Sequence, residues 1–236
     1  MNLVLLDKKD FVDHETVALK GRRLTHLLSV NRVRERDSLV CGLLNGKIGT
    51  GTITKQTEDF LEMRIELNQD PPKPLPLTLV LALPRPKMLK RIIEAVTTLG
   101  VKHIHLINSW RVEKTYWQSP LLEIEELRKY MFLGLEQGRD TILPRISLHR
   151  FFTKFVTEDL PSISNDSLKI AAHPKAGRIC PSGVNTETTL IIGPEGGFID
   201  IEMETLTKQG FLSCHIGPRI LRVETAVTFL IARLFG

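Results

Sequence analysis

Short runs of apolar residues separated by polar turns characterise the first part of the chain. We expect strands at residues 3–6, 38–44, 47–54 and 60–67, and one or two helical turns at 24–30. Asn45-Gly46 separates two of these runs, and this dipeptide is typical of a tight β-hairpin. Several short strands in so short a segment predict a small β-barrel.

Strands alternate with helices in the second part. We expect strands at 77–83, 101–107, 168–172, 189–192 and 212–216, and helices at 87–99, 121–136, 202–209 and 224–234. The first of these strands is apolar throughout, as expected for a strand that is covered on both faces. The alternation predicts an α/β domain with a largely parallel sheet.

A proline-rich connector lies between the two parts. Residues 71–76 read Pro-Pro-Lys-Pro-Leu-Pro, and four prolines in six positions neither continue a helix nor fit a central strand. Such a stretch is stiff and extended. We therefore predict a first domain at 1–70, a linker at 71–76 and a second domain at 77–236.

Composition narrows the class of protein. The 236 residues are 42% hydrophobic and 25% charged, which is ordinary for a globular chain, and no apolar run approaches the length of a membrane span. The N-terminus becomes charged at Asp7, so we expect no signal peptide, no membrane partner and a cytoplasmic location. Cys41, Cys180 and Cys214 are widely spaced and form no C-x-x-C pair, which favours buried free thiols over a metal or disulfide site.

Positive charge gathers in one stretch of the first domain. The net charge is +5. Residues 20–36 contain one acidic residue, Glu35, and six lysines and arginines: Lys20, Arg22, Arg23, Arg32, Arg34 and Arg36. Such a cluster can neutralise several phosphates of a nucleic acid. A solvated surface stretch is the alternative, and charge runs are usually of that kind.

Three loops rich in glycine and proline follow the last three predicted strands, at 173–177, 193–198 and 217–226. In open parallel sheets, ligands bind beyond the carboxyl ends of the strands. Glycines there let a ligand approach the backbone closely. Any one loop alone is better interpreted as a turn, but three at one edge of a sheet favour a binding site.

Other familiar motifs are absent or incomplete. Residues 46–51 resemble a phosphate loop but lack G-K-[ST], and no predicted strand is followed by G-x-G-x-x-G, which argues against a nicotinamide-dependent enzyme. His103 and His105 have a spacing that metals use, but no carboxylate or thiol partner is evident. We therefore interpret them as ordinary strand residues and predict no metal.

Two segments near the C-terminus carry a family resemblance. Residues 192–198 read Ile-Gly-Pro-Glu-Gly-Gly-Phe, and residues 216–226 read Ile-Gly-Pro-Arg-Ile-Leu-Arg-Val-Glu-Thr-Ala. Together they resemble the paired signature of the RsmE-type small-subunit rRNA uracil-N3 methyltransferases of the SPOUT superfamily. Glu136-Gln137-Gly138-Arg139, followed by Leu143-Pro144, is similar to a further segment of that family.

The resemblance implies a fold, a cofactor and partners. It implies a SPOUT-type α/β domain with a C-terminal trefoil knot, preceded by a PUA-like RNA-binding β-barrel, in a homodimer with the active site at the subunit interface. It also implies S-adenosylmethionine (SAM) as cofactor and methylation of a uridine N3 in 16S rRNA of the 30S subunit. Glu94 and Thr98 depart from the residues that the family often has at these positions.

The expected site residues follow from the loops and the resemblance. Cofactor binding is assigned to Ala172, His173, Ile192, Gly193, Pro194, Glu195, Gly196, Gly197, Ile216, Gly217, Ile220, Leu221, Arg222, Thr225 and Ala226. RNA binding is assigned to Arg22, Arg23, Arg32, Arg34 and Arg139.

Three residues are assigned to catalysis. Arg222 is expected to stabilise charge on the uracil oxygens, with Glu195 or Glu224 orienting it or accepting the N3 proton. An Arg222–Glu224 ion pair that merely holds the loop is the alternative. Two other functions stay open, a ribose 2′-O methyltransferase of the same superfamily and an RNA-binding assembly factor without turnover.

Overall fold

The computed structural model describes residues 2–236, apart from the side chains of Val30 and Asn31. The chain forms two compact units. Unit 1 contains the chain up to Lys73 together with Met131–Leu143, and unit 2 contains Pro74–Tyr130 and Pro144–Gly236. The predicted division into 1–70, 71–76 and 77–236 stays a prediction of domain organisation, and Met1, with which it begins, lies outside the described residues.

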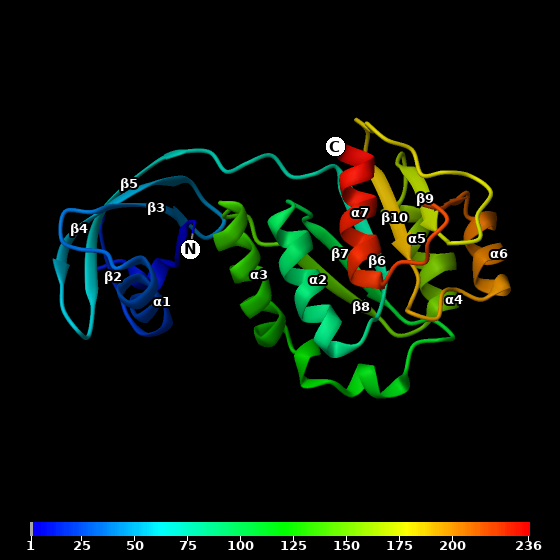
Figure 1. Cartoon of the computed structure of the whole chain (residues 1–236), viewed down its shortest axis with the longest axis horizontal. Helices are drawn as coiled ribbons and strands as arrows, with labels where there is room; N and C mark the ends of the chain where they lie inside the picture. The colour runs from blue at the N-terminus through cyan, green and yellow to red at the C-terminus, as the bar shows by residue number, and fades with distance from the viewer. Residues whose placement is uncertain (1) are drawn as a thin grey trace. The chain divides into compact units, whose positions relative to one another are not determined.

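Unit 1 is built on a curled five-stranded sheet with the strand order β1-β3-β4-β5-β2 (Figure 1). Its strands are β1 (Val4–Leu6), β2 (Thr16–Leu19), β3 (Ser38–Leu43), β4 (Ile48–Gln56) and β5 (Leu61–Gln69). Strand β1 pairs parallel to β3, and the other neighbours are antiparallel. Within the described chain no ladder joins the edge strands β1 and β2, so the predicted barrel is present as a curled, open sheet.

Local sequence explains most of this sheet. Asn45 adopts a left-handed φ of 58° in the predicted hairpin between β3 and β4. Gly49 lies at an irregularity of the β4–β5 ladder, where an added Cβ would lie 1.8 Å from the Glu66 carbonyl oxygen, so only glycine fits. The expected helical turns are α1 (Gly21–His26) and a π-helical turn at Leu27–Asn31, and a 3-10 turn spans Lys8–Asp10. The short strand β2 was missed by the sequence analysis.

A distant segment completes unit 1. Leu135 is fully buried in a cluster with Leu3, Leu5 and Ile48. The backbone N–H of Leu3 donates to the Glu136 carbonyl at 3.1 Å, which fixes the segment beside β1. The apolar pattern predicts a helix here but not its packing partner, because such contacts join residues that are far apart in the sequence.

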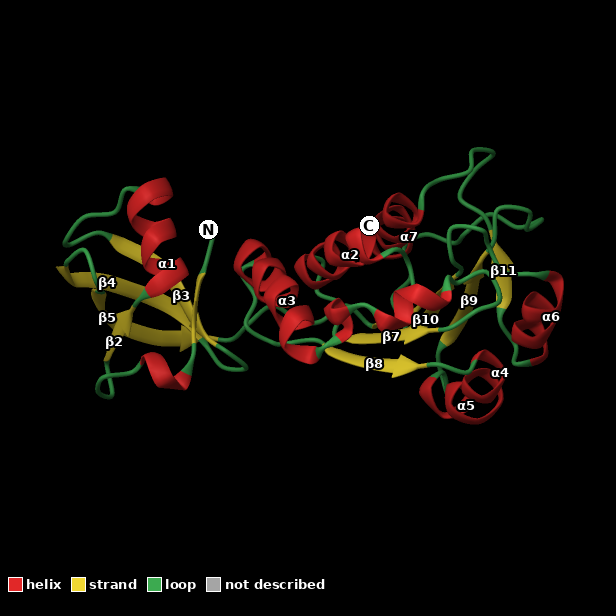
Figure 2. Ribbon diagram, turned by 90° about the horizontal axis from the view of Figure 1, so that it is seen from below, coloured by secondary structure: helices red, strands yellow, loops and turns green. Residues whose placement is uncertain are grey.

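Unit 2 contains a six-stranded sheet in which every pair of neighbours is parallel, as predicted (Figure 2). The strand order is β11-β9-β10-β6-β7-β8. Its strands are β6 (Leu77–Ala82), β7 (His103–Ile107), β8 (Arg145–His149), β9 (Leu168–Ala172), β10 (Thr188–Ile192) and β11 (Leu212–Cys214). Strand β8 was missed, because it is an edge strand whose residues are mostly exposed and show no apolar run.

Helices cover both faces of this sheet. The helices that lie wholly in unit 2 are α2 (Pro86–Thr98), α4 (Phe152–Lys154), α5 (Leu160–Ile163), α6 (Asp200–Lys208) and α7 (Val223–Phe235), whereas α3 (Ile124–Gly138) begins in unit 2 and ends in unit 1. Short 3-10 turns lie at Lys114–Gln118 and Pro120–Leu122, and a π-helical turn spans Phe155–Asp159. Helices α2 and α7 pack on each other over one face, and α4 and α5 lie over the other (Figure 2). None of the helices described is long and apolar enough to cross a membrane.

The order of the strands creates a switch point. From β6 the chain adds β7 and β8 on one side; on the other side it then forms β9, inserts β10 between β9 and β6, and adds β11 at the edge. Connections that leave a parallel sheet in opposite directions open a crevice at the carboxyl ends of the strands. This edge is where the three predicted loops emerge.

Candidate functional site

The carboxyl ends of three neighbouring strands meet in register. Ala172, the last residue of β9, is paired with Ile192 at the end of β10 and with Cys214 at the end of β11. The loops that follow these strands therefore start side by side, as the sequence analysis predicted. They enclose a cavity of about 340 Å³ in unit 2, closed on one side by the start of α7.

Backbone conformation shapes this cavity. Gly217 has a φ of 128° and Gly197 a φ of 71°, which L-residues with side chains rarely adopt. The ideal Cβ position of each meets no atom within 4 Å, so a side chain there would enter the open space along the loops. At Gly193, by contrast, a Cβ would lie 3.1 Å from the backbone nitrogen of Phe198. The glycines thus keep the cavity wall thin and fix the path of the loops.

Two long-range contacts brace the middle loop. The guanidinium of Arg111, from the loop after β7, donates to the carbonyl oxygen of Gly196. The buried carboxylate of Glu202 accepts from the backbone N–H of Ile199 at 3.0 Å and from that of Trp110 at 2.8 Å. The loop after β10 is therefore held against the loop after β7, and the cavity is preorganised.

Most of the residues predicted for cofactor binding line this cavity. They are Ala172, His173, Ile192, Gly193, Pro194, Glu195, Gly196, Gly197, Ile216, Gly217, Ile220, Leu221 and Ala226. Arg222 and Thr225 do not line it: both side chains are exposed at the start of α7. At this helix terminus their neighbours Leu221, Val223 and Ala226 face the cavity instead.

The sequence analysis overlooked several lining residues. They are Arg111, Pro174, Lys175, Phe198, Asp200, Cys214, His215, Arg219, Val223 and Leu230. Most belong to the predicted loops or flank them. Arg111 is far away in sequence, and only its position just beyond the carboxyl end of β7 gives a signal that could have found it.

The three predicted catalytic residues occupy different positions. Glu195 lies at the cavity, and its carboxylate accepts the backbone N–H of Arg85 at 3.1 Å. Arg222 is the residue before the first turn of α7, and Glu224 lies half-buried within that turn. Among the described residues no ion pair joins Arg222 to Glu224, so the geometry gives no support to a purely structural pairing of the two.

Among the residues that the structure describes, histidines and thiols form no group that could hold a metal ion. His105 Nδ1 lies 3.0 Å from His149 Nε2, and burial lowers the pKa of His105 to about 4. All three cysteines are free and buried, and burial raises the pKa of the Cys41 thiol to about 12. In the chain from residue 2 onward, no group of three or more potential ligands among His, Cys, Asp and Glu is arranged to hold a metal ion.

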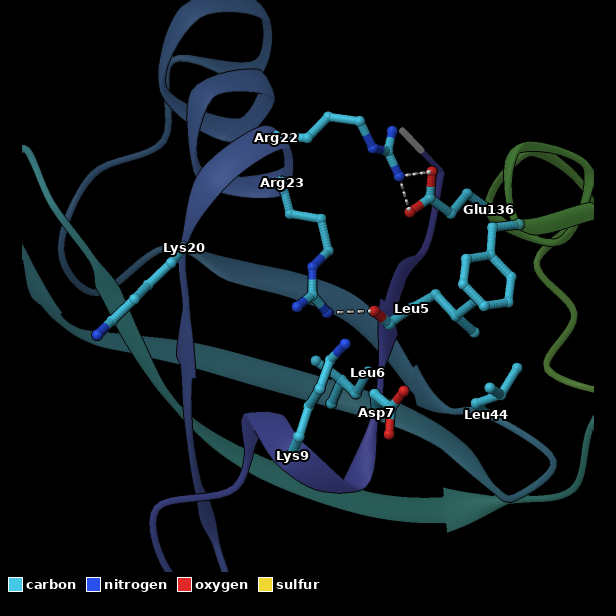
Figure 3. Close-up of a pocket in the computed structure, with 10 residues that line it drawn as sticks. Leu5, Leu6, Asp7, Lys9, Lys20, Arg22, Arg23, Leu44 and Glu136 are labelled. Carbon is cyan, nitrogen blue, oxygen red and sulfur yellow. Dashed lines mark hydrogen bonds and ion pairs between the residues drawn. The ribbon is translucent and has the colours of Figure 1, made fainter. Parts of the chain in front are cut away.

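Unit 1 contains a second, smaller pocket of about 220 Å³, in which charged side chains gather (Figure 3). Arg22 donates to the Glu136 carboxylate at 3.2 and 3.3 Å, and Arg23 donates to the Leu5 carbonyl oxygen at 2.8 Å. Arg23 also forms two 2.6 Å bonds with the buried carboxylate of Asp10. Its guanidinium is thus committed to the fold, which favours a structural role over the predicted phosphate contact.

The other predicted RNA-binding arginines are exposed. Arg32 and Arg34 lie in the turn before β3, and Arg139 follows the C-terminal end of α3 with a left-handed φ of 53°. Arg139 belongs to unit 1 by its contacts, although the sequence pattern placed it in the second domain. Four exposed or half-exposed arginines, Arg22 included, therefore belong to one compact unit.

Comparison with known proteins identifies the family. A family model described as an RNA methyltransferase domain matches residues 71–235. The chain is 30% identical over 233 residues to ribosomal RNA small subunit methyltransferase E of Treponema pallidum, covering 96% of this chain and 87% of that protein. It is 26% identical to the enzyme of the same name from Bacillus subtilis, covering 97% and 93% of the two chains.

The fold agrees with these relatives. The crystal structure of ribosomal RNA small subunit methyltransferase E from Neisseria gonorrhoeae bound to S-adenosyl methionine matches with a TM-score of 0.75 at 21% identity. The match covers 98% of this chain and 95% of that one. The family model, the curated relatives and the fold thus agree, and the chain belongs to the ribosomal RNA small subunit methyltransferase E family.

Proposed function

We propose that this protein transfers the methyl group of SAM to N3 of a uridine in the 16S rRNA of the small ribosomal subunit. The observation that carries the proposal is the cavity at the carboxyl ends of β9, β10 and β11, which the family signature surrounds. The related structure from Neisseria gonorrhoeae, which shares this fold, is bound to S-adenosyl methionine.

The cavity fits such a cofactor in size and chemistry. Its wall combines glycine backbone with apolar side chains, among them Ile192, Ile220 and Leu221, and with charged ones such as Asp200 and Arg219. Backbone N–H and C=O groups suit the edge of an adenine and the hydroxyls of a ribose, and the apolar side chains suit the faces of the base. When bound, SAM supplies an electrophilic methyl group on a sulfonium.

The chain's own residues must handle the N3 proton. A uracil N3–H is a weak acid, and its loss places negative charge on O2 and O4. We assign proton acceptance to Glu195, because its carboxylate lies at the cavity and the Arg85 N–H holds it in place. Arg222 and Glu224 are assigned to the substrate side of the helix terminus, where a guanidinium would stabilise the developing negative charge.

Unit 1 is proposed to hold the rRNA. Arg22, Arg32, Arg34 and Arg139 supply exposed or half-exposed cations that can contact phosphates without reading the sequence. These contacts predict RNA binding that weakens as salt concentration rises. The PUA-like character of this unit belongs to the same proposal.

A homodimer is also proposed, with the paired helices α2 and α7 as its interface. A shallow, largely apolar hollow on this face includes Ala95, Leu99 and Ala232. Glu94 and Thr98, which depart from the family pattern, also line this hollow and not the cofactor cavity. The C-terminal trefoil knot and a cytoplasmic location, where the small subunit is assembled, complete the proposal.

The test is transfer of tritium from labelled SAM to purified 30S subunits that lack their own uridine N3 methylation, followed by nucleoside analysis. We expect label in 3-methyluridine. Label in a ribose 2′-O-methyl nucleoside would replace the proposed reaction by that of the wider superfamily. No label, together with no binding of SAM, would leave an RNA-binding protein without turnover.

A further inference from the structure

One large aromatic side chain stands in solvent close to the cofactor cavity. Trp110 is 79% exposed, whereas the second tryptophan of the chain, Trp117, is 8% exposed and donates its indole N–H to Asn108. A tryptophan usually buries most of its surface, because its ring system is large and mostly apolar. Exposure of Trp110 leaves that surface available to a partner.

The backbone beneath Trp110 is held on three sides. Its own N–H donates to the buried Glu202 carboxylate at 2.8 Å, and the next residue, Arg111, donates to Gly196. Two residues earlier, the Asn108 N–H donates to the His149 carbonyl at 2.9 Å. A rigid loop therefore presents an indole that contributes little to the packing of unit 2. Because the backbone is already fixed, ordering of the loop adds little to the entropy cost of binding a partner there.

The sheet places Trp110 at the functional edge. Because β7 and β8 are parallel and Ile107 pairs with His149, the loops that carry Trp110 and Phe151 emerge side by side. Phe151 is 72% exposed. The cofactor cavity lies at the same edge of the sheet, at the strands on the other side of β6. The contact between Glu195, after β10, and Arg85, after β6, lies between this cavity and the loops after β7 and β8.

Positive charge surrounds this aromatic half of the edge. Arg85, Arg111, Lys114 and Arg150 are exposed on the connections after β6, β7 and β8, against the exposed Glu113 and, further along the connection after β7, Glu123. Exposed aromatic rings among cations are the combination by which proteins bind single-stranded nucleic acid, since bases stack on the rings and cations contact the phosphates. The charge disfavours an apolar protein segment as the occupant.

We infer that Trp110 is a positioning residue that stacks on an unpaired base of the RNA, next to the uridine presented to the cofactor cavity. This inference rests on the proposed function, because it takes RNA as the substrate. Stacking of a neighbouring base would hold the strand along the edge while the target base lies at Glu195. Trp110 touches neither the methyl donor nor N3.

Fluorescence tests the contact directly. Titration of the full-length protein with a single-stranded oligouridylate of about ten nucleotides should quench the emission of Trp110. Trp110→Phe should keep the affinity within about two-fold, since a phenyl ring still stacks, but should lose most of the quenching, because only the buried Trp117 remains. Unchanged quenching in Trp110→Phe would overturn the inference.

Kinetics separates positioning from folding. Trp110→Ala should weaken oligouridylate binding and raise KM for 30S subunits about ten-fold, with kcat and SAM affinity unchanged. Leu212→Ala is the matched control, because it shortens an exposed apolar side chain at the opposite, amino end of β11. This variant should change neither oligouridylate binding nor KM. Trp110→Ala with unchanged affinity and KM would overturn the inference.

Two further outcomes remain distinguishable. If Trp110→Ala converts a dimer to a monomer in sedimentation, a second copy of the chain covers the indole and the stacking role is wrong. If the wild-type protein transfers no methyl group but Trp110 is still quenched by RNA, the proposed reaction fails while the stacking contact stands.

Discussion

The cavity of unit 2 is lined mainly by the loops after three neighbouring strands, through glycine backbone, apolar side chains and some charged ones, whereas the pocket of unit 1 is lined by four cations, two carboxylates and a few apolar side chains. The first is held open by glycine conformations and by contacts to buried elements. The second depends on ion pairs. We expect the cavity of unit 2 to tolerate many side-chain changes but not the replacement of its glycines. In the pocket of unit 1, by contrast, we expect the loss of one charged side chain to matter, because its partner is left unpaired.

Intrinsic fluorescence can follow unit 2 alone. All tryptophans and tyrosines of the chain, Trp110, Trp117, Tyr116 and Tyr130, belong to unit 2. Unit 1 is followed by amide hydrogen exchange of its strands. Changes in one unit can therefore be measured separately from changes in the other.

The largest effect is expected at the buried ion pair of unit 1. Asp10→Ala removes the partner of the mostly buried Arg23 guanidinium, and we expect unit 1 to lose about 3–5 kcal/mol of stability, because an unpaired buried charge remains. Glu15→Ala breaks the exposed pair with Arg64 in the same unit and should cost under about 1 kcal/mol. Amide hydrogen exchange of β2 and β5 measures the loss of stability in both variants. Equal losses would contradict the view that burial makes the Asp10–Arg23 pair the more important one.

A change in the wall of the cavity should come next. Gly217→Val forces a β-branched residue to a φ of 128° and adds atoms at the cavity, so we expect SAM affinity to fall about 100-fold, or about 2.8 kcal/mol. Gly183→Val, at a φ of 64° and not among the lining residues, imposes backbone strain without obstruction. Calorimetric titration should find near-normal affinity in this control. A similar loss in both variants would mean that strain, not the cavity, sets the affinity.

Acid should destabilise unit 2 through His105. Burial lowers its folded-state pKa from 6.5 to about 4, so the stability that neutral His105 contributes is complete above pH 6.5 and is lost as the pH falls towards 4. We expect a loss of about 2 kcal/mol across this window, after allowing for solvent screening. His105→Gln should flatten the dependence in urea unfolding followed by tryptophan fluorescence. An unchanged slope would assign the pH dependence to His149, which lies beside His105, or to Asp159, which lies beside His149.

The smallest expected effect is on the stability of unit 1, which we expect to fall as the pH rises, the reverse of the dependence expected for His105. Burial raises the pKa of Glu136 above 4.5, so the stability of its protonated form is present below that value and is lost as the pH rises through the folded-state pKa. Glu136→Gln should therefore stabilise unit 1 by up to about 1 kcal/mol at neutral pH and not at pH 4, because the exposed Arg22 loses little. Amide hydrogen exchange of unit 1, measured at neutral pH and at pH 4 in Glu136→Gln and in the wild-type protein, tests this prediction. Destabilisation at neutral pH would mean that the pair with Arg22 outweighs burial.

Much of the fold was readable from local pattern. The continuous apolar run of β6, the stripe of α2 and the Asn45-Gly46 turn are all found where the sequence predicts them. Each rests on periodicity or turn chemistry, which act over a few residues. The missed elements, β2 and β8, are short or exposed edge strands that lack this signal.

The candidate site divides in the same way. The sequence by itself determined that three glycine-rich loops end parallel strands, and hence most of the cavity wall. Only the tertiary structure decided that Arg111 braces Gly196, that Arg222 and Thr225 are exposed and do not line the cavity, and that Arg23 is paired with Asp10.

The assignment of the segment Met131–Leu143 to unit 1 was likewise decided only in three dimensions. The physical reason is common to all these cases. Local propensity fixes where elements begin and end, whereas packing between distant residues fixes which side chains meet, and that packing leaves no periodic trace in the chain.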